Sequence, residues 1–454
     1  MRGHPTDFDR WAASGLPGWS FKDVLPLFRR QEHWEAPAGD ALRGQGGPLH
    51  TRLTRCMDPL TQAVIDAGEQ AGHPRVEDYN GAEQHGLGRL QFTIRDGRRC
   101  SAADAFLRPA LQRPNLHVAT GALASQVLME GDRAVGVAFR SEGQERLAYA
   151  DKEVLLSGGV INSPQLLMLS GIGDPDELSR HGIPLRAAVP GVGCNFQDHV
   201  TVPLPFRRRS TGALHHHMRA DRVVMDLARA YLWGTGFASD VPSPLAGFLK
   251  TDPQLPAPDI QLLLHTGPLD THPYLQPFVP PYEDAFSLLV VLLRPHARGR
   301  VRLASPNPAQ APRIEQNFLG DTRDWAGLAK GLRLAAAIAG QPALAPHVEA
   351  PLGQPDMSDE SALKAYIGQR SATVHHPAGT CKMGVDDMAV VDERLCVRGV
   401  RGLRVVDASV MPDLVGGNIN AAVLMIAERA ADMIRAAHGQ KQAETKLPAE
   451  ERGT

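Results

Sequence analysis

The first strongly patterned part of the chain, residues 115–169, alternates short apolar runs with turn residues. Residues 116–121 (LHVATG) are mainly apolar, so we expect a short strand there. Residues 125–141 carry strand patterning on both sides of Gly131-Asp132, which predicts a β-hairpin that turns at this pair. This part of the chain is therefore expected to be sheet.

A strand, a tight turn and a helix are predicted next. Residues 154–157 are mostly apolar and end at the pair Gly158-Gly159, which suits a tight turn. Proline favours the first turn of a helix, so we expect a helix that begins near Pro164 and runs to Ser170.

The middle of the chain, residues 201–369, has a different composition and hydrophobic pattern. Pro-rich loops fill residues 241–281, and the continuous apolar run 286–293 (FSLLVVLL) predicts a buried strand. A hairpin is expected through Arg298-Gly299-Arg300, with both arginines on solvated strand faces, and a helix around residues 328–339. These patterns indicate a second domain.

The C-terminal part returns to strand and helix. A strand is predicted at 403–406, followed by a loop that ends at Pro412. A helix is expected over 420–437, with one apolar stripe made of Val423, Ile426, Ala427, Ala430 and Ile434. The Lys-, Glu- and Ala-rich tail, residues 441–454, is expected to be flexible.

Composition narrows the class of protein. The chain has 454 residues, a net charge of −2 and both signs mixed throughout, which argues against nucleic acid as a partner and favours small neutral molecules. The five cysteines form no C-x-x-C pair, so a reducing cytoplasm is the expected compartment. The longest apolar run is too short to cross a bilayer, which leaves peripheral membrane contact as the open alternative.

Seven segments, in the same order along the chain, resemble the glucose-methanol-choline (GMC) family of flavin-dependent oxidoreductases. They are RGHPTDFDRWAASGLPGWSFKDVLPLFRRQE, GRRCSAADAFLRPA, GGVINSPQLLMLSGIG, VGCNFQDH, LRPHARGRVRLASPNP, HHPAGTCKMG and GLRVVDASVMPDLVGGNINAAVLMIAERAADMI. Val160 departs from the smaller residue that is usual in the third segment. The resemblance covers nearly the whole chain.

The resemblance implies an α/β (α+β) fold with two domains. An incomplete Rossmann-like FAD-binding domain would come from residues 100–200 and 373–440, the second of which holds the active-site loops. A substrate domain built on an antiparallel sheet with flanking helices would come from 201–372. Residues 1–99 would form a lid and connecting segment.

One family feature is not found in the sequence. GMC enzymes begin with a strand, a G-x-G-x-x-G turn and a helix that holds the FAD pyrophosphate. Gly-x-Gly occurs at Gly86, Gly171 and Gly191, but none follows a predicted strand and opens a helix, so we interpret all three as loop glycines. We therefore expect an N-terminally truncated chain that retains no FAD by itself, or one half of a split protein.

His376 is the candidate catalytic base. A residue before proline is pushed toward extended backbone, so Pro377 should hold the imidazole in a defined direction. Histidine has a pKa suited to taking a proton from an alcohol. The resemblance aligns His376 with the family's catalytic histidine, whereas His375 is expected to have no catalytic role.

Asn418 matches the second active-site position of the family. Its amide could donate a hydrogen bond to a developing alkoxide. Asparagine just ahead of a helix is also a common N-cap, so the sequence leaves catalysis and capping open, with Asn420 as the other candidate cap.

The resemblance also implies cofactor contacts. Asp407 and Ala408 would lie against the flavin ribityl and pyrophosphate, and Gly417 and Asn418 near the isoalloxazine. Residues 195–199 (NFQDH) resemble a loop that braces the sheet and are predicted to be structural.

The run His215-His216-His217 is not expected to bind a metal. Consecutive loop residues cannot easily all face one ion, and no carboxylate cluster accompanies them. A solvated loop is therefore predicted, and no metal site.

The function implied is FAD-dependent oxidation of a primary alcohol, choline-like or other, to the aldehyde, with an unknown electron acceptor. The alternatives are an inactive or split fragment and a flavin-fold lyase that would keep the histidine without redox turnover. Choline would require an aromatic or acidic cage, and the sequence, with 5% aromatic residues, indicates none.

Overall fold

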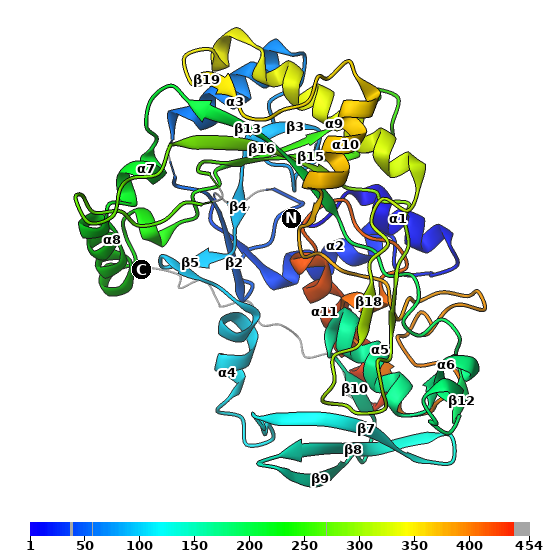
Figure 1. Cartoon of the computed structure of the whole chain (residues 1–454). Helices are drawn as coiled ribbons and strands as arrows, with labels where there is room; N and C mark the ends of the chain where they lie inside the picture. Colours follow the sequence, from blue (N-terminus) through cyan, green and yellow to red (C-terminus); the bar gives the residue numbers. More distant parts are fainter. Residues whose placement is uncertain (37–39, 57, 269, 440–454) are drawn as a thin grey trace.

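The structure, a computed structural model, describes residues 1–36, 40–56, 58–268 and 270–439. An antiparallel sheet with helices forms the upper part of the molecule in Figure 1, and an α/β part lies below it. The N-terminal end lies between the two parts (Figure 1). The predicted flexible tail, 441–454, lies outside the described residues.

The upper part is built on a seven-stranded sheet in the order β19-β13-β16-β15-β14-β3, with β20 paired to β13. Its strands are β3 (Gly86–Arg89), β13 (Val200–Arg208), β14 (Leu245–Leu249), β15 (Ile260–His265), β16 (Ala285–Leu292), β19 (Val348–Pro351) and β20 (Ala372–Thr373). All pairings in this sheet are antiparallel.

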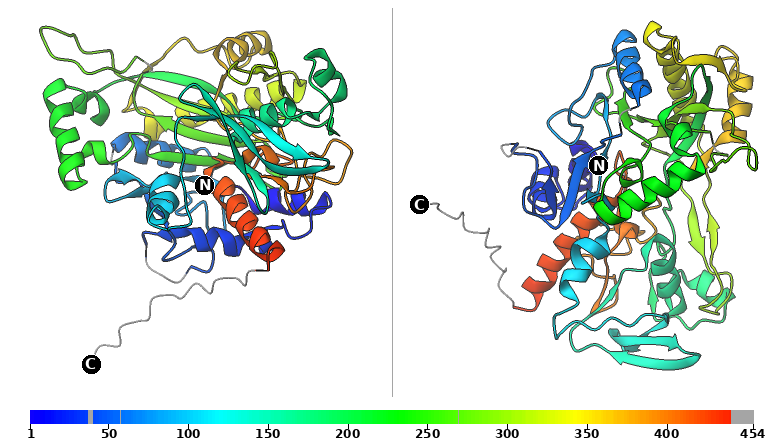
Figure 2. Two further views of the ribbon diagram at one scale, coloured as in Figure 1. Left: turned by 90° about the horizontal axis from the view of Figure 1, so that it is seen from below. Right: turned by 90° about the vertical axis from the view of Figure 1, so that its left-hand side faces the viewer.

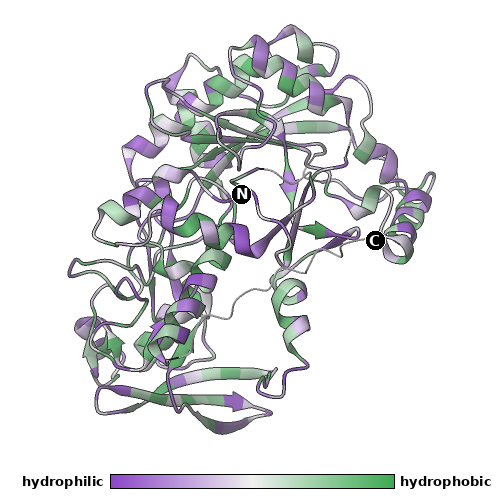
Figure 3. Cartoon of the chain, turned by 180° about the vertical axis from the view of Figure 1, so that it is seen from behind, coloured by the Kyte–Doolittle hydropathy of each residue, from purple (hydrophilic) through white to green (hydrophobic). Residues whose placement is uncertain are grey.

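The core of the upper part lies between this sheet and helices. The helices are α3 (Pro59–Gln70), α9 (Thr322–Ala339) and α10 (Glu360–Arg370), and their buried leucines pack on apolar side chains of the strands. Asp321 caps α9 by accepting from Arg323 N, which is why this helix starts well before the apolar pattern. Figure 3 shows the central strands mainly in the hydrophobic colours.

The lower part contains a parallel pair, β10 (Val154–Leu156) and β21 (Leu403–Val405). Helices α5 (Gly159–Leu169) and α11 (Asn420–Ala437) and the antiparallel meander β7 (Ala122–Glu130), β8 (Arg133–Ser141) and β9 (Gln144–Tyr149) accompany it. A second apolar cluster joins these elements, except the exposed β9, to α1 (Pro5–Ala13) and α2 (Phe21–Gln31). Figure 2 shows α11 beside the N-terminal helices.

The remaining elements lie outside the large sheet, the parallel pair and the meander. They are β1 (Glu32–Trp34), β2 (Leu49–Leu53), β4 (Gln91–Phe92), β5 (Ile94–Arg95), β6 (Arg98–Arg99), the π-helical η1 (Ala103–Leu107), α4 (Arg108–Ala110), β11 (Ile172–Gly173), α6 (Pro175–Arg180), β12 (Ala187–Ala188), α7 (Ala213–His217), α8 (Ala220–Trp233), η2 (Phe237–Ser239), β17 (Arg300–Arg302), β18 (Arg313–Glu315), η3 (Pro342–Leu344) and η4 (Ala408–Val410).

The α/β (α+β) fold class is confirmed, as are the hairpin of β7 and β8, the buried strand β16, the strand β21 and the helix α11. Each has a strong local pattern. The domain division stays a prediction. Strand β3 joins the antiparallel sheet from outside residues 201–372, and β20 lies across the boundary at residue 372.

Three element predictions were wrong. Residues 116–121 form no strand and are exposed, so the sheet begins only at β7. Helix α5 begins at Gly159 and carries Pro164 inside it, because Gly158 takes the N-cap position. Arg298 lies before a strand, and β17 pairs with β18 across a longer loop, so no tight hairpin turns there.

The predictions for the Gly-x-Gly glycines and for the apolar stripe of the last helix also need correction. Gly86 and Gly88 are strand residues of β3, where a Cβ on Gly88 would lie 2.1 Å from Val76 O. Gly173 also belongs to a short strand, β11. The apolar stripe of α11 is shifted, since Ile426 and Ala430 are buried but Ala427 is exposed.

The run His215-His216-His217 ends helix α7 instead of lying in a loop. His217 Nδ1 lies 2.6 Å from Asp226 Oδ2, and the His215 ring packs against Tyr282. Among the described residues, no cluster of histidine, cysteine and carboxylate side chains could hold a metal ion.

Candidate active site

His376 and Asn418 meet at the junction of the two parts. His376 follows β20 in a loop, and Asn418 lies just ahead of α11. The His376 Nε2 atom lies 3.1 Å from Asn418 Nδ2. The two residues that the sequence singled out as catalytic are therefore in direct contact.

The loop that carries His376 is held from several sides. The His376 amide donates to Asp198 Oδ1 over 2.9 Å, and Thr373 Oγ1 donates to the other oxygen of the same carboxylate. His375 has a φ of 62°, a left-handed conformation that is uncommon for a histidine, and its amide donates to Thr373 Oγ1 over 2.8 Å. This backbone conformation, and not Pro377 alone, sets the direction of the imidazole.

The environment keeps His376 neutral. Burial, with positive charge from His375 and the N-terminal amine, lowers the pKa of His376 from 6.5 to about 4. At neutral pH its imidazole therefore carries no charge and can accept a proton.

His199 contacts the other side of the His376 ring. Its Nδ1 lies 3.1 Å from His376 Nδ1, and its Nε2 lies 3.2 Å from Leu293 O. His199 is completely buried, and burial lowers its pKa well below the ordinary value. The prediction that residues 195–199 only brace the sheet was therefore incomplete, because Asp198 and His199 both contact the candidate base.

Asn418 is not a helix cap. The N-cap of α11 is Ile419, which has no side-chain cap bond, and Asn420 is already the first helical residue. The Asn418 amide is instead engaged at both ends, because Gln261 Nε2 donates to its Oδ1 over 3.4 Å. The capping alternative is wrong for both asparagines, and the amide is directed at His376.

A cavity of about 210 Å³ lies beside Asn418. Its walls combine apolar side chains with amides, among them Met1, Phe92, Asn80, Gln31 and Asn418. The Gln31 side-chain oxygen is buried without a hydrogen-bond partner among the described residues. This donor and acceptor set suits a flat heterocycle with polar edge groups.

The Asp407 carboxylate is satisfied by the chain itself. It accepts from Gly159 N over 2.9 Å, Ser163 Oγ over 2.6 Å and Ser409 N over 2.8 Å. It thereby ties the end of β21 to the start of α5. A contact of Asp407 or Ala408 with a cofactor stays a prediction, and one through this carboxylate would compete with these three donors.

Gly417 has a φ of 153°, where a side chain would be strained. A Cβ at this position would also meet Met1 and Phe248 at 3.6 and 3.7 Å. The glycine therefore lets the chain pass close to the cavity wall before Asn418.

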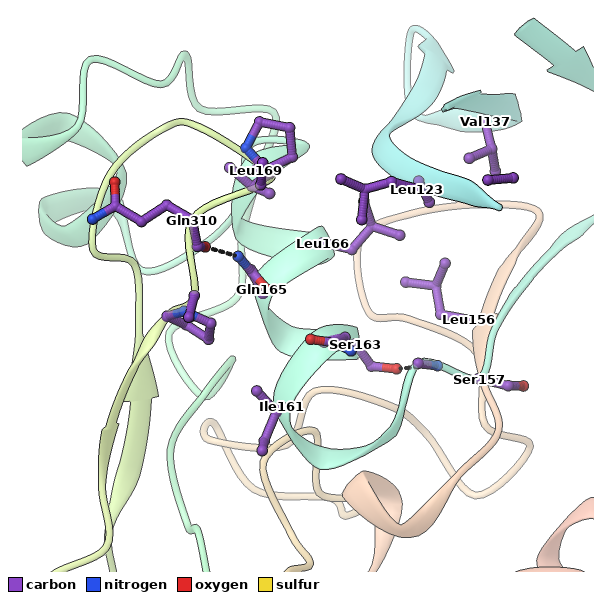
Figure 4. Close-up of a pocket in the computed structure, with 18 of the residues that line it drawn as sticks. Leu123, Val137, Leu156, Ser157, Ile161, Ser163, Gln165, Leu166, Leu169 and Gln310 are labelled. Carbon is purple, nitrogen blue, oxygen red and sulfur yellow. Dashed lines mark hydrogen bonds between the residues drawn. The ribbon is translucent and has the colours of Figure 1, made fainter. Parts of the chain in front are cut away.

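A larger cavity, of about 600 Å³, lies elsewhere, between β7, β10, α5 and the loop before β18. Figure 4 shows Leu123, Leu156 and Leu166 on its walls and the hydrogen bond of Gln165 to Gln310. Neither His376 nor Asn418 lines it, so its size does not make it the reaction site.

Comparison with known proteins identifies the family. The model of the GMC oxidoreductase N-terminal domain matches residues 1–201, and that of the C-terminal domain matches residues 295–427. The chain belongs to the GMC oxidoreductase family.

Relatives in this family are similar over nearly the whole chain. Human mitochondrial choline dehydrogenase is 41% identical over 440 residues, which are 96% of this chain and 73% of the human protein. The oxygen-dependent choline dehydrogenase of Brucella anthropi is 38% identical over 96% of this chain and 78% of the relative.

Solved structures of GMC proteins share the fold. Pyridoxine 4-oxidase from Mesorbium loti is 31% identical with a TM-score of 0.84, over 97% of this chain and 82% of the oxidase. Formate oxidase from Aspergillus oryzae, whose structure concerns FAD modification, is 25% identical with a TM-score of 0.88, over 97% of this chain and 82% of the other.

The expected N-terminal truncation is not supported by these matches. The N-terminal family model covers residues 1–201, and the chain spans most of the fold of its relatives. The expectation that the chain retains no FAD by itself rested on the missing G-x-G-x-x-G turn, on which these matches do not bear, and it stays a prediction. The cofactor of the GMC enzymes is FAD.

The described residues include no membrane-spanning helix. None of their helices combines the length and the apolar character needed to span a bilayer. The cytoplasmic location stays a prediction, and the name of the human relative places that protein in the mitochondrion.

Proposed function

We propose that the chain oxidises a small primary alcohol to the aldehyde with FAD as its hydride acceptor. The observation that carries the proposal is the contact of His376 Nε2 with Asn418 Nδ2 beside a cavity lined with amides. A neutral base and an amide donor are the two groups that removal of a hydroxyl proton requires.

The donor set beside Asn418 fits a flavin. The unpartnered Gln31 oxygen can accept from an N–H group at the edge of the isoalloxazine, and the apolar walls suit its faces. Gly417 and Asn418 would lie against the ring, and the turn at Asp407 and Ala408 against the ribityl chain. When bound there, FAD supplies the acceptor for the hydride that leaves the alcohol carbon.

His376 accepts the hydroxyl proton at Nε2, and Asn418 donates an N–H to the oxygen as negative charge grows on it. The bond between carbon and oxygen becomes the aldehyde double bond while one carbon–hydrogen bond breaks. Asn418 is engaged with His376 in the structure, so the substrate hydroxyl replaces that contact when it binds. No charged group has to be created before the reaction, because burial already keeps His376 neutral.

The lining of the cavity bears on which alcohol fits. Its carboxylate, Glu32, already pairs with Arg2 at 2.6 Å and Arg43 at 2.8 Å, so it offers no free negative charge for a quaternary ammonium. Phe28 and Phe92 supply aromatic surface. We therefore expect compact primary alcohols as substrates, with choline compared directly against its neutral isostere 3,3-dimethyl-1-butanol.

Anaerobic stopped-flow spectroscopy tests the proposal. The purified protein is loaded with FAD, mixed with each alcohol, and followed at the flavin absorbance. Bleaching that depends on the alcohol, together with recovery of the aldehyde, supports the function. Full flavin loading with no bleaching by any alcohol in the panel would reject it, and aldehyde release without bleaching would favour the lyase.

A further inference from the structure

The NFQDH segment, residues 195–199, has no place yet in the proposed chemistry, although it contacts the base. The imidazole rings of His199 and His376 meet edge to face, with ring centres 5.3 Å apart and planes at 88°. The Nδ1 atom of His199 lies 3.1 Å from the Nδ1 atom of His376. One of these two atoms must carry the hydrogen, and the surroundings decide which.

Leu293 decides the tautomer of His199. A carbonyl oxygen only accepts hydrogen bonds, so His199 Nε2, 3.2 Å from Leu293 O, is the nitrogen that carries the hydrogen. A neutral imidazole has a single N–H, so His199 Nδ1 is an acceptor. His376 Nδ1 is then the donor of the 3.1 Å contact, and His376 Nε2 keeps its lone pair.

Gln261 leads to the same tautomer from the opposite end. Its Nε2 donates to Asn418 Oδ1 over 3.4 Å, which leaves Asn418 Nδ2 facing His376. An amide nitrogen only donates, so His376 Nε2 at 3.1 Å must be the acceptor. Donation therefore runs in one direction from Gln261 through Asn418, His376 and His199 to Leu293.

The relay of hydrogen bonds formed by Gln261, Asn418, His376, His199 and Leu293 is held at both ends by the register of the sheet. Val200 of β13 pairs with Leu292 of β16, so His199 and Leu293 are the next residues at the same end of the strand pair. Thr373 of β20 also pairs with Val200, which places His376 three residues beyond that pairing. Gln261 pairs with Val291 on the other side of β16. Fixed strand pairing therefore sets the spacing of His199, Leu293 and Gln261, and of the strand that leads to His376.

We infer that His199 is a positioning residue that holds His376 in the tautomer with a hydrogen on Nδ1 and a lone pair on Nε2. This is the form that can take a proton from an alcohol bound near Asn418. The inference about the tautomer stands on geometry, and its catalytic consequence rests on the proposed function of His376.

Nitrogen NMR of the whole protein labelled with ¹⁵N-histidine tests the tautomer directly. The His376 signals are identified as those missing from the spectrum of His376→Asn. We expect a pyrrole-type Nδ1 and a pyridine-type Nε2 at neutral pH in the native protein. The opposite assignment in the native protein would overturn the inference without the need of any variant at His199.

Two variants then separate positioning from packing. His199→Gln keeps an acceptor oxygen for His376 and an N–H donor for Leu293, so it should retain the tautomer and a rate of flavin reduction within about threefold of native. His199→Leu fills the space but accepts nothing, so His376 should show a mixed or reversed tautomer and a rate about ten- to a hundredfold lower, a smaller loss than removal of the base itself.

The remaining outcomes are distinguishable. An unchanged His376 tautomer in folded His199→Leu overturns the inference, as does an equal loss of rate in both variants with the tautomer retained. A tautomer that follows His199 while His376→Ala reduces flavin at the native rate supports the inference and rejects His376 as the base.

Discussion

At the scale of single residues, the candidate base owes its properties to its neighbours. His376 is neutral because it is buried, it is aimed by the left-handed His375 before it, and its amide is held by Asp198. The strain of a left-handed histidine is of a kind that concentrates at functional sites. In an exposed position, the same loop would give its histidine the ordinary pKa of an imidazole.

Removal of the base should abolish most of the chemistry. We expect His376→Ala to slow alcohol-dependent flavin reduction by about 10²–10⁴-fold, the usual worth of a general base, with FAD still bound. Stopped-flow bleaching measures it. His375→Asn is the matched control, because asparagine tolerates the left-handed backbone and should change the rate little. Bleaching at the native rate in His376→Ala would remove this residue from the mechanism.

Loss of the amide donor should slow flavin reduction less than loss of the base does. Asn418→Ala is expected to slow flavin reduction by about 10²–10³-fold, as for the loss of one oxyanion donor. Because Asn418 forms no cap on α11, the effect is not a frayed helix. Asn418→His keeps an N–H donor and should recover part of the rate. Equal rates for native protein and Asn418→Ala would leave the residue with a structural role only.

The buried histidines should also make stability depend on pH. Both His376, with a pKa of about 4, and His199, with a lower pKa than usual, bind a proton less readily when folded than the ordinary 6.5 of an unfolded chain. Between about pH 4 and 6.5 the unfolded state binds more protons, so the free energy of unfolding rises with pH through this window. Urea unfolding at several pH values measures this free energy. In His376→Asn it should rise less with pH than in the native protein.

At the scale of elements, strand β3 depends on close approach of the backbone. Gly88 sits where the chain of Val76 passes so near that a side chain has no room. This is why two glycines that the sequence suggested were loop residues belong to the edge of the antiparallel sheet.

Gly88→Ala should therefore destabilise the protein by about 1–3 kcal/mol, the typical cost of overpacking. Chemical denaturation measures it. Gly340→Ala, after α9, is the control, since its Cβ would make an ordinary 3.5 Å contact and should cost no more than about 0.5 kcal/mol. Equal stabilities for the two variants would mean that β3 shifts freely.

At the scale of the whole molecule, one buried carboxylate joins the N-terminal helix to both sides of the site. Asp7, on α1, accepts from Gly416 N over 2.7 Å and from the Arg294 guanidinium. Gly416 precedes the glycine and asparagine of the active-site loop, and Arg294 follows Leu293, the end of the histidine relay. The first helix is thus part of the support of the site.

Asp7→Asn should destabilise the protein by about 1.5–3 kcal/mol, the worth of a hydrogen bond to a charged group, and slow flavin reduction. Asp151→Asn is the control and should change neither, because the Asp151 side chain is exposed and forms no hydrogen bond or ion pair with the described residues. Thermal unfolding and stopped flow give the two readouts. A variant that keeps native stability would show that Arg294 and Gly416 hold their places without Asp7.

Local pattern alone was enough for several features of this protein. The β7–β8 hairpin, β16 and α11 follow from alternation, a continuous apolar run and an amphipathic stripe, which are properties of neighbouring residues. The choice of His376 and Asn418 came from motif segments, and their contact followed because both loops belong to the same family arrangement.

Tertiary structure alone decided the rest. His199 lies 177 residues from His376, and Gln261 lies 157 residues from Asn418, so no local pattern could pair them. Their contacts depend on the register of four strands, β13, β15, β16 and β20, that come from distant parts of the chain. The position of Asn418 outside the helix cap, and the role of Asp7, depend likewise on backbone paths that form only when the two parts pack together.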